Sequence, residues 1–338
     1  MVSVTTTAAL PLLPILQRAF PEIISYNVED TIVQASADGF RVTTASSSNN
    51  NDNISNGNGN GNDNGMELFV KCVEASKYSS RPWGDLRRAL LYSRTEARFY
   101  SDILPMLREN LLSSSSSPSS DSDSAWDIAP KCYLAESNLV DLIDESESTA
   151  AKKQSKDDGN GYPDPKYDIN NDAILRGKGG NLVLESLSST NTNAKYKYYQ
   201  TSPLSISQAS QCLSAAAKFH AAAFENEDIL QAVSTKLCEN GGSYHLKNRN
   251  PKELEQLQQT WDDIVSNIED ALPSGFFEVE RIRNIGQRIY NVAEYVSEQL
   301  SPKYNEKFAT IVHGDYKAMN VFLPLVDKDH NNDNDDDD

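Results

Sequence analysis

The spacing of the apolar residues changes halfway along this chain, and the change limits the fold more than any other feature of the sequence. In the first half, four segments alternate apolar and polar residues or run apolar, and they are rich in the β-branched and aromatic side chains that strands favour. These segments lie at 39–45, 66–75, 128–137 and 179–188.

A single helix is predicted among these strands, over residues 85–107, where apolar side chains recur every three or four positions. The positions that form this stripe are Ala89, Leu90, Ala97, Tyr100, Ile103, Leu104 and Leu107.

The second half is predicted to be helical, because 205–224, 253–272 and 282–300 each place apolar residues on one face of a helix. In 205–224 that face comprises Ile206, Ala209, Leu213, Ala217, His220 and Phe224. After these helices, residues 308–324 predict a strand, a polar loop and a second strand. A sheet with one helix, followed by helices, predicts an α+β chain with an N-terminal antiparallel sheet and a mainly helical C-terminal lobe.

Four polar segments interrupt this pattern, and we expect them to be disordered loops because they lack the apolar residues that would offset the entropy of ordering. They lie at 46–65, 112–125, 145–175 and 325–338. We therefore divide the chain into an N-terminal helical segment at 1–34, an N-lobe at 35–188, a partial helical C-lobe at 189–324 and an acidic tail at 325–338.

The formal net charge of −18 is not balanced by a basic stripe in the sequence. Nucleic acid and anionic membranes are therefore not expected as partners. No transmembrane helix is predicted, because the sequence contains no run of about 18 apolar residues. The cysteines form no C-x-x-C pair, which predicts free thiols in a reducing compartment rather than a zinc site. We expect a cytoplasmic monomer whose cysteines are Cys72, Cys132, Cys212 and Cys238.

The segment IVHGDYKAMNVFLP (311–324) carries the strongest chemical signal. Asn320 follows Asp315 by five residues, which is the spacing of the base and the Mg²⁺ ligand in kinase catalytic loops. Asp315 is therefore the candidate base and Asn320 the candidate metal ligand. His313 would support the loop by hydrogen bonding, and Lys317 would reach the transferred phosphate. The alternatives are a polar surface turn and, for Lys317, a solvated side chain.

A lysine within an apolar strand, Lys71 in LFVKCV, requires a partner or a ligand. Glu96 lies in the predicted helix that follows, in the pattern E-x-x-F-Y with Phe99 and Tyr100. An ion pair between Lys71 and Glu96 would orient the lysine toward nucleotide phosphates. The alternative is a Lys71 side chain that points outward from an edge strand.

Two further segments have less specific signals. LVLESL (182–187) would lead into a hinge between the lobes, where the backbone from Glu185 to Leu187 could contact adenine. His220 lies on an apolar helix face, and a hydrogen-bonded core histidine explains it more simply than a metal ligand.

Together these residues resemble the choline kinase/aminoglycoside phosphotransferase superfamily, and within it the CHK kinase-like group, which includes the ecdysteroid kinase-like proteins. The matching pieces follow the order of that family, namely LFVKCV, E-x-x-FY, PKCYLAES, LVLESL, AAAKFHA, GGSYH and IVHGDYKAMNVFL. The resemblance implies a protein-kinase-like bilobal fold, ATP with Mg²⁺, and transfer to a hydroxyl group of a small molecule. It assigns the base to Asp315, a metal ligand to Asn320, and the ion pair to Lys71 and Glu96.

The sequence departs from the family pattern in two places. Only Gly39 lies in QASADGFRV (34–42), where the family has a glycine-containing turn over the phosphates. No apolar strand with the second metal-binding aspartate follows the loop, because Asp327 and Asp329 come too early.

We expect the sequence to be cut short within a polar insert. The alternatives are a pseudokinase that binds nucleotide without catalysis, and an acidic tail that supplies the missing metal ligands. A protein kinase is disfavoured, because H-G-D replaces H-R-D and no activation segment is recognisable.

Overall fold

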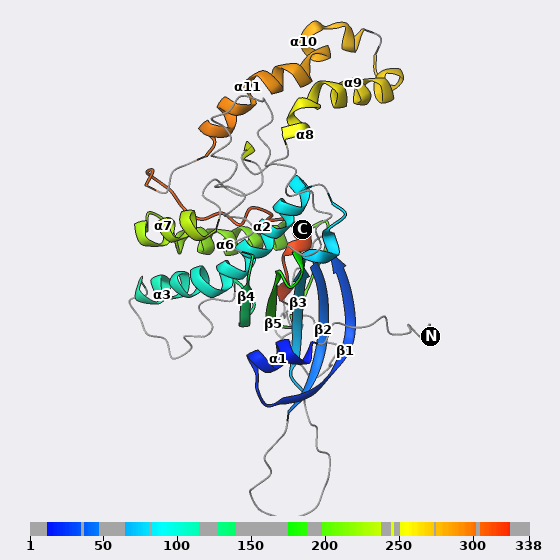
Figure 1. Cartoon of the computed structure of the whole chain (residues 1–338). Coiled ribbons are helices and arrows are strands. Elements are labelled where there is room, and N and C mark those ends of the chain that lie inside the picture. The colour runs from blue at the N-terminus through cyan, green and yellow to red at the C-terminus, as the bar shows by residue number, and fades with distance from the viewer. Residues whose placement is uncertain are drawn as a thin grey trace, which may run out of the picture.

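Figure 1 shows the computed structural model, in which the N-terminal part forms a sheet flanked by helices and residues 251–299 form a helical arm. The structure describes residues 12–34, 37–46, 65–81, 83–114, 128–139, 175–187, 198–237, 245–246, 251–273, 275–301 and 305–324. The polar inserts lie almost entirely outside these residues, and so do the acidic tail, Cys238, Asp327 and Asp329.

The sheet is five-stranded and antiparallel, with the strand order β1-β2-β3-β5-β4. Its strands are β1 (Ile23–Gln34), β2 (Ala37–Ser46), β3 (Glu67–Glu74), β4 (Cys132–Ser137) and β5 (Gly179–Glu185). The four strands predicted in the first half of the chain all form. With the helical C-terminal part, this confirms the α+β class and is consistent with a kinase-like fold.

The prediction of a helical N-terminal segment over 1–34 is wrong for residues 23–34, which form β1. This stretch contains β-branched residues, among them Val28, Thr31 and Ile32, which favour extended backbone. Pairing with β2 from Ile23↔Ser46 to Gln34↔Ala37 then satisfies the backbone groups on the side of the strand that faces β2. The sheet therefore begins at Ile23 rather than after residue 34.

One face of the sheet is covered by α1 (Leu13–Ala19). Leu12 and Leu16 are fully buried there against a cluster that includes Leu68, Val70 and Val183. Alternation along β3 explains this packing, because Leu68 and Val70 point to α1 while the residues between them point to the opposite face.

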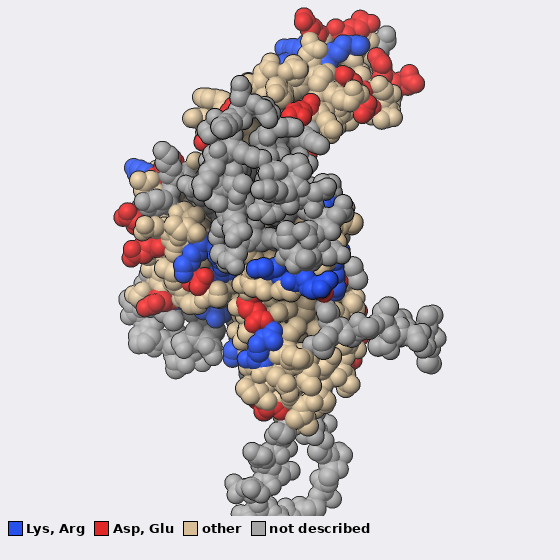
Figure 2. Space-filling view, in the orientation of Figure 1, with Lys and Arg blue, Asp and Glu red and all other residues tan. Residues whose placement is uncertain are grey.

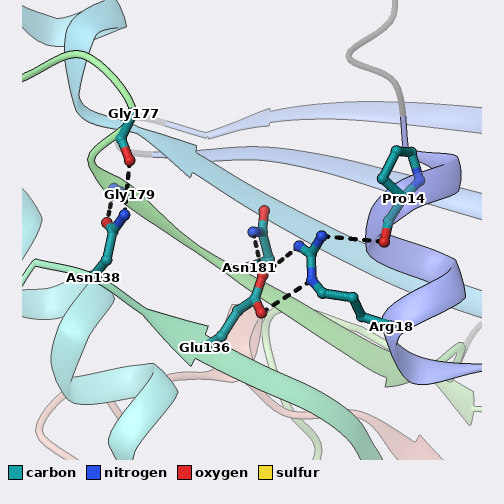
Figure 3. Close-up of polar contacts among 7 residues, drawn as sticks. All are labelled: Pro14, Arg18, Glu136, Asn138, Gly177, Gly179 and Asn181. Carbon is teal, nitrogen blue, oxygen red and sulfur yellow. Dashed lines mark hydrogen bonds and ion pairs between the residues drawn. The ribbon is translucent and has the colours of Figure 1, made fainter.

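A polar clamp fixes α1 to the edge of the sheet, as Figure 3 shows. The Arg18 guanidinium donates from Nε to Glu136 Oε2 at 3.2 Å and from Nη2 to Glu136 Oε1 at 2.5 Å. Asn181 Nδ2 also donates to Glu136 Oε1, at 2.8 Å, and Arg18 Nη1 donates to the Pro14 carbonyl at 3.1 Å. The clamp therefore joins α1 to both β4 and β5.

One continuous helical segment follows β3, as predicted, and its first part covers the opposite face of the sheet. It consists of α2 (Trp83–Arg98), a π-helical turn η2 (Phe99–Ile103) and α3 (Leu104–Ser114), and it follows a short 3-10 turn η1 (Ala75–Tyr78). Six of the seven positions in the predicted stripe are buried and Tyr100 is half-buried. The segment extends to Ser114, into the serine-rich stretch that we expected to be a loop from residue 112.

The helices of the second half begin with α6 (Ile206–Ala221) and α7 (Glu227–Lys236), which pack with α3 around one core cluster. Ser205 caps α6 in a capping box with Gln208, and Asn226 caps α7 by accepting from the Ile229 N–H at 3.1 Å. These caps satisfy backbone N–H groups at both helix starts.

The arm consists of helices that pack mainly on each other. They are α8 (Pro251–Glu255), α9 (Leu257–Ile268), η7 (Glu269–Ala271), η8 (Phe276–Glu278), α10 (Glu280–Arg283) and α11 (Ile285–Gln299). Trp261 Nε1 on α9 donates to the Ile282 carbonyl at 2.8 Å. Gly286 is buried where α11 meets α9, and its missing side chain allows the close approach.

The predicted apolar faces of the later helices are only partly buried. On α6, Ile206 and Leu213 are 92% and 69% exposed, whereas Cys212 and Phe219 on other faces are buried. The face predicted for 282–300 is also largely exposed, at Ile289, Val292, Val296 and Leu300. Periodicity identifies these helices correctly, but burial depends on which neighbouring elements cover them.

Within the part of the chain that the structure describes, no helix combines the length and apolar character needed to cross a membrane. Charges of both signs are interspersed on the face shown in Figure 2, and acidic side chains gather at the far end of the arm. Cys72 and Cys212 are buried free thiols, as expected, and Cys132 is a half-buried one.

Candidate functional site

The first part of the site is the ion pair between Lys71 and Glu96. Lys71 lies on β3 at the centre of the sheet, and alternation directs its side chain away from α1 and toward α2. Its Nζ is 2.6 Å from Glu96 Oε2, and the two side chains are 17% and 35% exposed. The predicted pair is present, and Lys71 is not on an edge strand.

A small pocket lies beside this pair, lined by Lys71, Glu96, Ser93, Gly180 and Leu182 among others. Gly180 allows β5 to approach β4 closely here, because a Cβ would lie only 2.9 Å from the Glu136 carbonyl oxygen. Its cavity volume is about 10 Å³, which is roughly the room that one water molecule needs. This pocket therefore does not accommodate a whole nucleotide.

The second part of the site is the loop at 313–320. Gly314 has φ 81, a left-handed conformation that glycine adopts without strain. The Asp315 carboxylate that follows is exposed, and its Oδ2 is 3.0 Å from Lys317 Nζ and 2.8 Å from Asn320 Nδ2. Asn320 Nδ2 also donates to the Asp315 carbonyl at 2.9 Å. The loop thus brings Asp315, Lys317 and Asn320 together.

These donors stabilise the charged form of Asp315. The hydrogen bond from Lys317 is the largest influence and lowers the pKa of the Asp315 carboxyl, with a further lowering by Asn320. Partial burial lowers the pKa of His313, while the charge of Asp315 opposes this shift. A neutral His313 is required by its contact, because His313 Nδ1 accepts from the Asp315 N–H at 3.3 Å. This contact lies within the loop, and the supporting role of His313 stays a prediction.

The loop is fixed to α6 by contacts that the sequence did not indicate. The Tyr316 hydroxyl donates to the Cys212 carbonyl at 2.5 Å, and Thr310 Oγ1 donates to the His220 carbonyl at 2.6 Å. The signal in the sequence that could have indicated these contacts is the presence of hydroxyl side chains on either side of His-Gly-Asp. Their acceptors are backbone groups, however, which have no signature in the sequence.

The strand predicted before the loop does not form. The backbone at 309–312 lies against the end of α6, where the Glu225 N–H donates to the Ala309 carbonyl at 3.0 Å. After the loop, a 3-10 turn η9 (Ala318–Asn320) precedes a two-residue strand β7 (Leu323–Pro324). A single carbonyl–amide contact to a helix end replaces the ladder that a strand would need.

The predicted hinge connects to the loop through β6 (Tyr198–Tyr199), which pairs with β7. The Tyr198 N–H donates to the Leu187 carbonyl at 3.3 Å, so β6 joins the end of β5 to the far side of the loop. The Glu185 N–H donates to the Lys131 carbonyl at 2.9 Å. These groups of Glu185 and Leu187 are therefore already used within the protein.

A binding site for Mg²⁺ would draw on Asn320, whose side-chain oxygen is the kind of hard ligand that this ion prefers. Across the ranges that the structure describes, no group of three or more His, Cys, Asp or Glu side chains could hold a metal ion. His220 is half-buried on α6 and does not belong to such a group.

Comparison with known proteins agrees with the motifs that lie within residues 171–333. The model of the ecdysteroid kinase-like family matches residues 171–333, a little less than half of the chain. The matched residues include β5, the helices from α6 to α11 and the loop with Asp315. Comparisons with curated proteins and with solved structures gave no match. The resemblance to the CHK kinase-like group, which includes the ecdysteroid kinase-like proteins, is therefore confirmed over residues 171–333.

Proposed function

We propose that this protein is an ATP-dependent phosphotransferase that acts on a hydroxyl group of a small molecule. The observation that supports it best is the conformation of the Asp315 loop, which presents an exposed carboxylate within the segment that matches a kinase-like family. The Lys71–Glu96 pair adds a second part that nucleotide-dependent phosphoryl transfer requires.

In this proposal, Asp315 orients the acceptor hydroxyl and accepts its proton. Like an ordinary aspartate, its carboxylate is ionised at neutral pH and can accept a hydrogen bond from the hydroxyl. The lowered pKa makes Asp315 a weaker base than an ordinary aspartate. A weak base suffices, because the transition state of phosphoryl transfer is loose and positioning contributes most of the rate. Lys317, which is 59% exposed, would turn from Asp315 toward the transferred phosphate.

The nucleotide would be held by residues of the sheet. Lys71 would contact the α- and β-phosphates, and Glu96 would fix the direction of the lysine. The backbone between Glu185 and Leu187 would lie near adenine through the groups that the protein does not use itself. Mg²⁺, when bound, neutralises phosphate charge, and Asn320 would offer it the side-chain oxygen.

We also propose that the N-lobe ends at residue 188, directly after β5, and that the helical lobe begins at 189. The protein would act as a cytoplasmic monomer, in keeping with the free thiols of Cys72, Cys132 and Cys212.

The test is ADP release by the full chain in a screen of small hydroxyl compounds, with Mg²⁺ present and absent. Asp315→Ala should lower kcat by about 10²-fold or more, because positioned acid–base groups contribute roughly 10²–10⁴-fold. Glu294→Ala removes an exposed carboxylate on α11 and serves as the control, with no change expected. Equal turnover by the Asp315→Ala variant would contradict the proposed role of the loop.

A second candidate is nucleotide binding without turnover. It is favoured by the occupied Asp315 carboxylate and by the absence, within the described ranges, of a cluster of three metal-ligating side chains. Calorimetric titration with ATP separates the two, since binding without ADP release, and without dependence on Mg²⁺, would identify this alternative.

A further inference from the structure

The helix that carries Glu96 changes its winding one turn after that residue. α2 ends at Arg98, the π-helical turn η2 spans Phe99–Ile103, and α3 continues from Leu104. A π turn of this kind inserts one extra residue, which rotates the following side chains by about 100° relative to a regular helix. Phe99 and Tyr100, the last two residues of the E-x-x-F-Y pattern, lie in this turn.

Tyr100 lies between two separate core clusters. The sheet cluster consists of Ala97, Leu182 and Leu184, with Phe69, Cys132 and Ala135 packed against it. The helical cluster consists of Ile103, Leu104, Leu107, Phe219, Ala222, Ala223, Ile229, Leu230, Ala309 and Ile311. The Tyr100 side chain packs against both clusters, and η2 contacts β4 on one side and α7 on the other.

The sheet cluster leads directly to the ion pair. Leu182 on β5 is the register partner of Lys71 on β3, and Ala97 follows Glu96 on α2. Tyr100 lies one helical turn beyond Glu96. Burial, followed by the charge of Glu96, raises the pKa of the Tyr100 hydroxyl, which agrees with this proximity. Tyr100 therefore packs against residues that are neighbours of both partners of the pair.

The helical cluster leads directly to the loop. Ala309 and Ile311 are buried in it, and Ile311 is two residues before His313. The Phe99 ring adds a second contact in the same direction, because its centroid is 5.5 Å from the Tyr100 ring and 6.2 Å from the Phe219 ring on α6. α6 in turn holds the loop through the Cys212 and His220 carbonyls.

We propose that Tyr100 is a positioning residue that couples the Lys71–Glu96 pair to the loop that carries Asp315. Because of the π turn, the Tyr100 ring lies between the sheet cluster and the helical cluster. The ring contacts both clusters and so joins them into one packed unit. An effect of Tyr100 on phosphoryl transfer rests on the proposed function. The coupling between the two clusters does not rest on it.

Hydrogen–deuterium exchange of the full chain tests the coupling without any ligand. In Tyr100→Ala, exchange should become about tenfold faster or more both in β5 (179–185) and in residues 305–312, because local opening no longer has to break a shared contact. Tyr100→Phe keeps the ring and should exchange like the wild type. Tyr100→Leu retains most of the apolar volume without the ring, and replaces Tyr100→Ala if that variant does not fold.

The matched control is Leu107→Ala. Leu107 is fully buried in the helical cluster and does not belong to the sheet cluster. This variant should speed exchange in α3 and in 305–312 but leave β5 unchanged. The coupling is overturned if Tyr100→Ala affects only one of the two regions, or if Leu107→Ala gives the same pattern as Tyr100→Ala.

A second arm adds ATP with Mg²⁺ to the same samples. Where the wild type is protected around Lys71, the Kd of ATP should be about tenfold higher in Tyr100→Ala and unchanged in Tyr100→Phe and Leu107→Ala, since only the first loosens the pair. A wild type that shows no response to nucleotide counts against the proposed function, while the ligand-free exchange pattern still decides the coupling.

Discussion

Among the site residues, Asp315 has a carboxylate whose hydrogen-bond donors and pKa shift can both be described. Lys317 and Asn320 both donate to Oδ2, at 3.0 and 2.8 Å, and they stabilise the charged form. The pKa of Asp315 is therefore below its ordinary value of 3.8. Because the pKa is lower in the folded state, Asp315 stabilises the fold at any pH above its ordinary pKa. This contribution to the free energy of unfolding is lost as the pH falls through the lower pKa of the folded state.

Replacing Lys317 with Met should raise the pKa of Asp315 toward its ordinary value, because the largest stabilising contact is removed. An NMR titration that follows the Asp315 carboxyl carbon measures this directly. Lys307→Met is the control, since Lys307 Nζ lies over the Phe308 ring at 4.6 Å. An Asp315 pKa that does not move in Lys317→Met would mean that the pair does not form in solution.

Some contacts of the site could be predicted from local chemistry and others could not. Lys71 and Glu96 were predictable, because a charge in an apolar strand must be compensated. Thr310 and Tyr316 were not, because they bind carbonyl groups of α6 whose position is set only when the loop docks against that helix.

Among the helices, the contact between α9 and α11 depends on one glycine. A Cβ at Gly286 would lie 2.5 Å from the Gln258 Cα and 2.5 Å from the Leu257 carbonyl oxygen. Both atoms are backbone, so the clash cannot be relieved by a side-chain rotation. The helices would have to move apart, and the apolar contacts between them would be weakened.

Gly286→Ala should destabilise the arm by about 1–2 kcal/mol, because overpacking costs about 1–3 kcal/mol and the better helix propensity of alanine returns less than about 1 kcal/mol. Chemical denaturation followed by tryptophan fluorescence measures it, since Trp261 on α9 reports on this contact. Glu294→Ala on the exposed side of α11 should change stability by less than about 0.5 kcal/mol. A neutral Gly286→Ala would mean that the two helices are further apart in solution.

Considered as a whole, the described chain has several cores rather than one. α1 and the sheet enclose one cluster, α2 and the sheet enclose others, and α3, α6 and α7 enclose the helical cluster. Long-range polar contacts connect these units, notably the Arg18–Glu136 clamp, which joins residues 118 positions apart in sequence. The integrity of the sheet around Lys71 therefore depends partly on α1.

Arg18→Ala should lower the free energy of unfolding by about 1 kcal/mol, since a bidentate pair that remains partly exposed contributes at the upper end of the range for surface pairs. Thermal unfolding followed by circular dichroism should show a Tm lower by a few degrees, and the difference should shrink at about 1 M salt. Glu269→Ala breaks a more exposed pair, with Arg283 at 3.9 Å, and should have almost no effect. Equal effects of the two substitutions would remove any special role for the clamp.

The sequence by itself determined the secondary-structure type of most described elements and the buried stripe of residues 85–107, and it predicted a charge partner for Lys71. Each depends on neighbours within a few residues or on a charge that must be compensated. Only the tertiary structure decided that 23–34 pairs as β1, that Phe219 rather than Leu213 is the covered side of α6, and that 309–312 follows a helix end instead of forming a strand. In each case the backbone and apolar groups have more than one way to be satisfied, and the choice depends on which distant element packs against them.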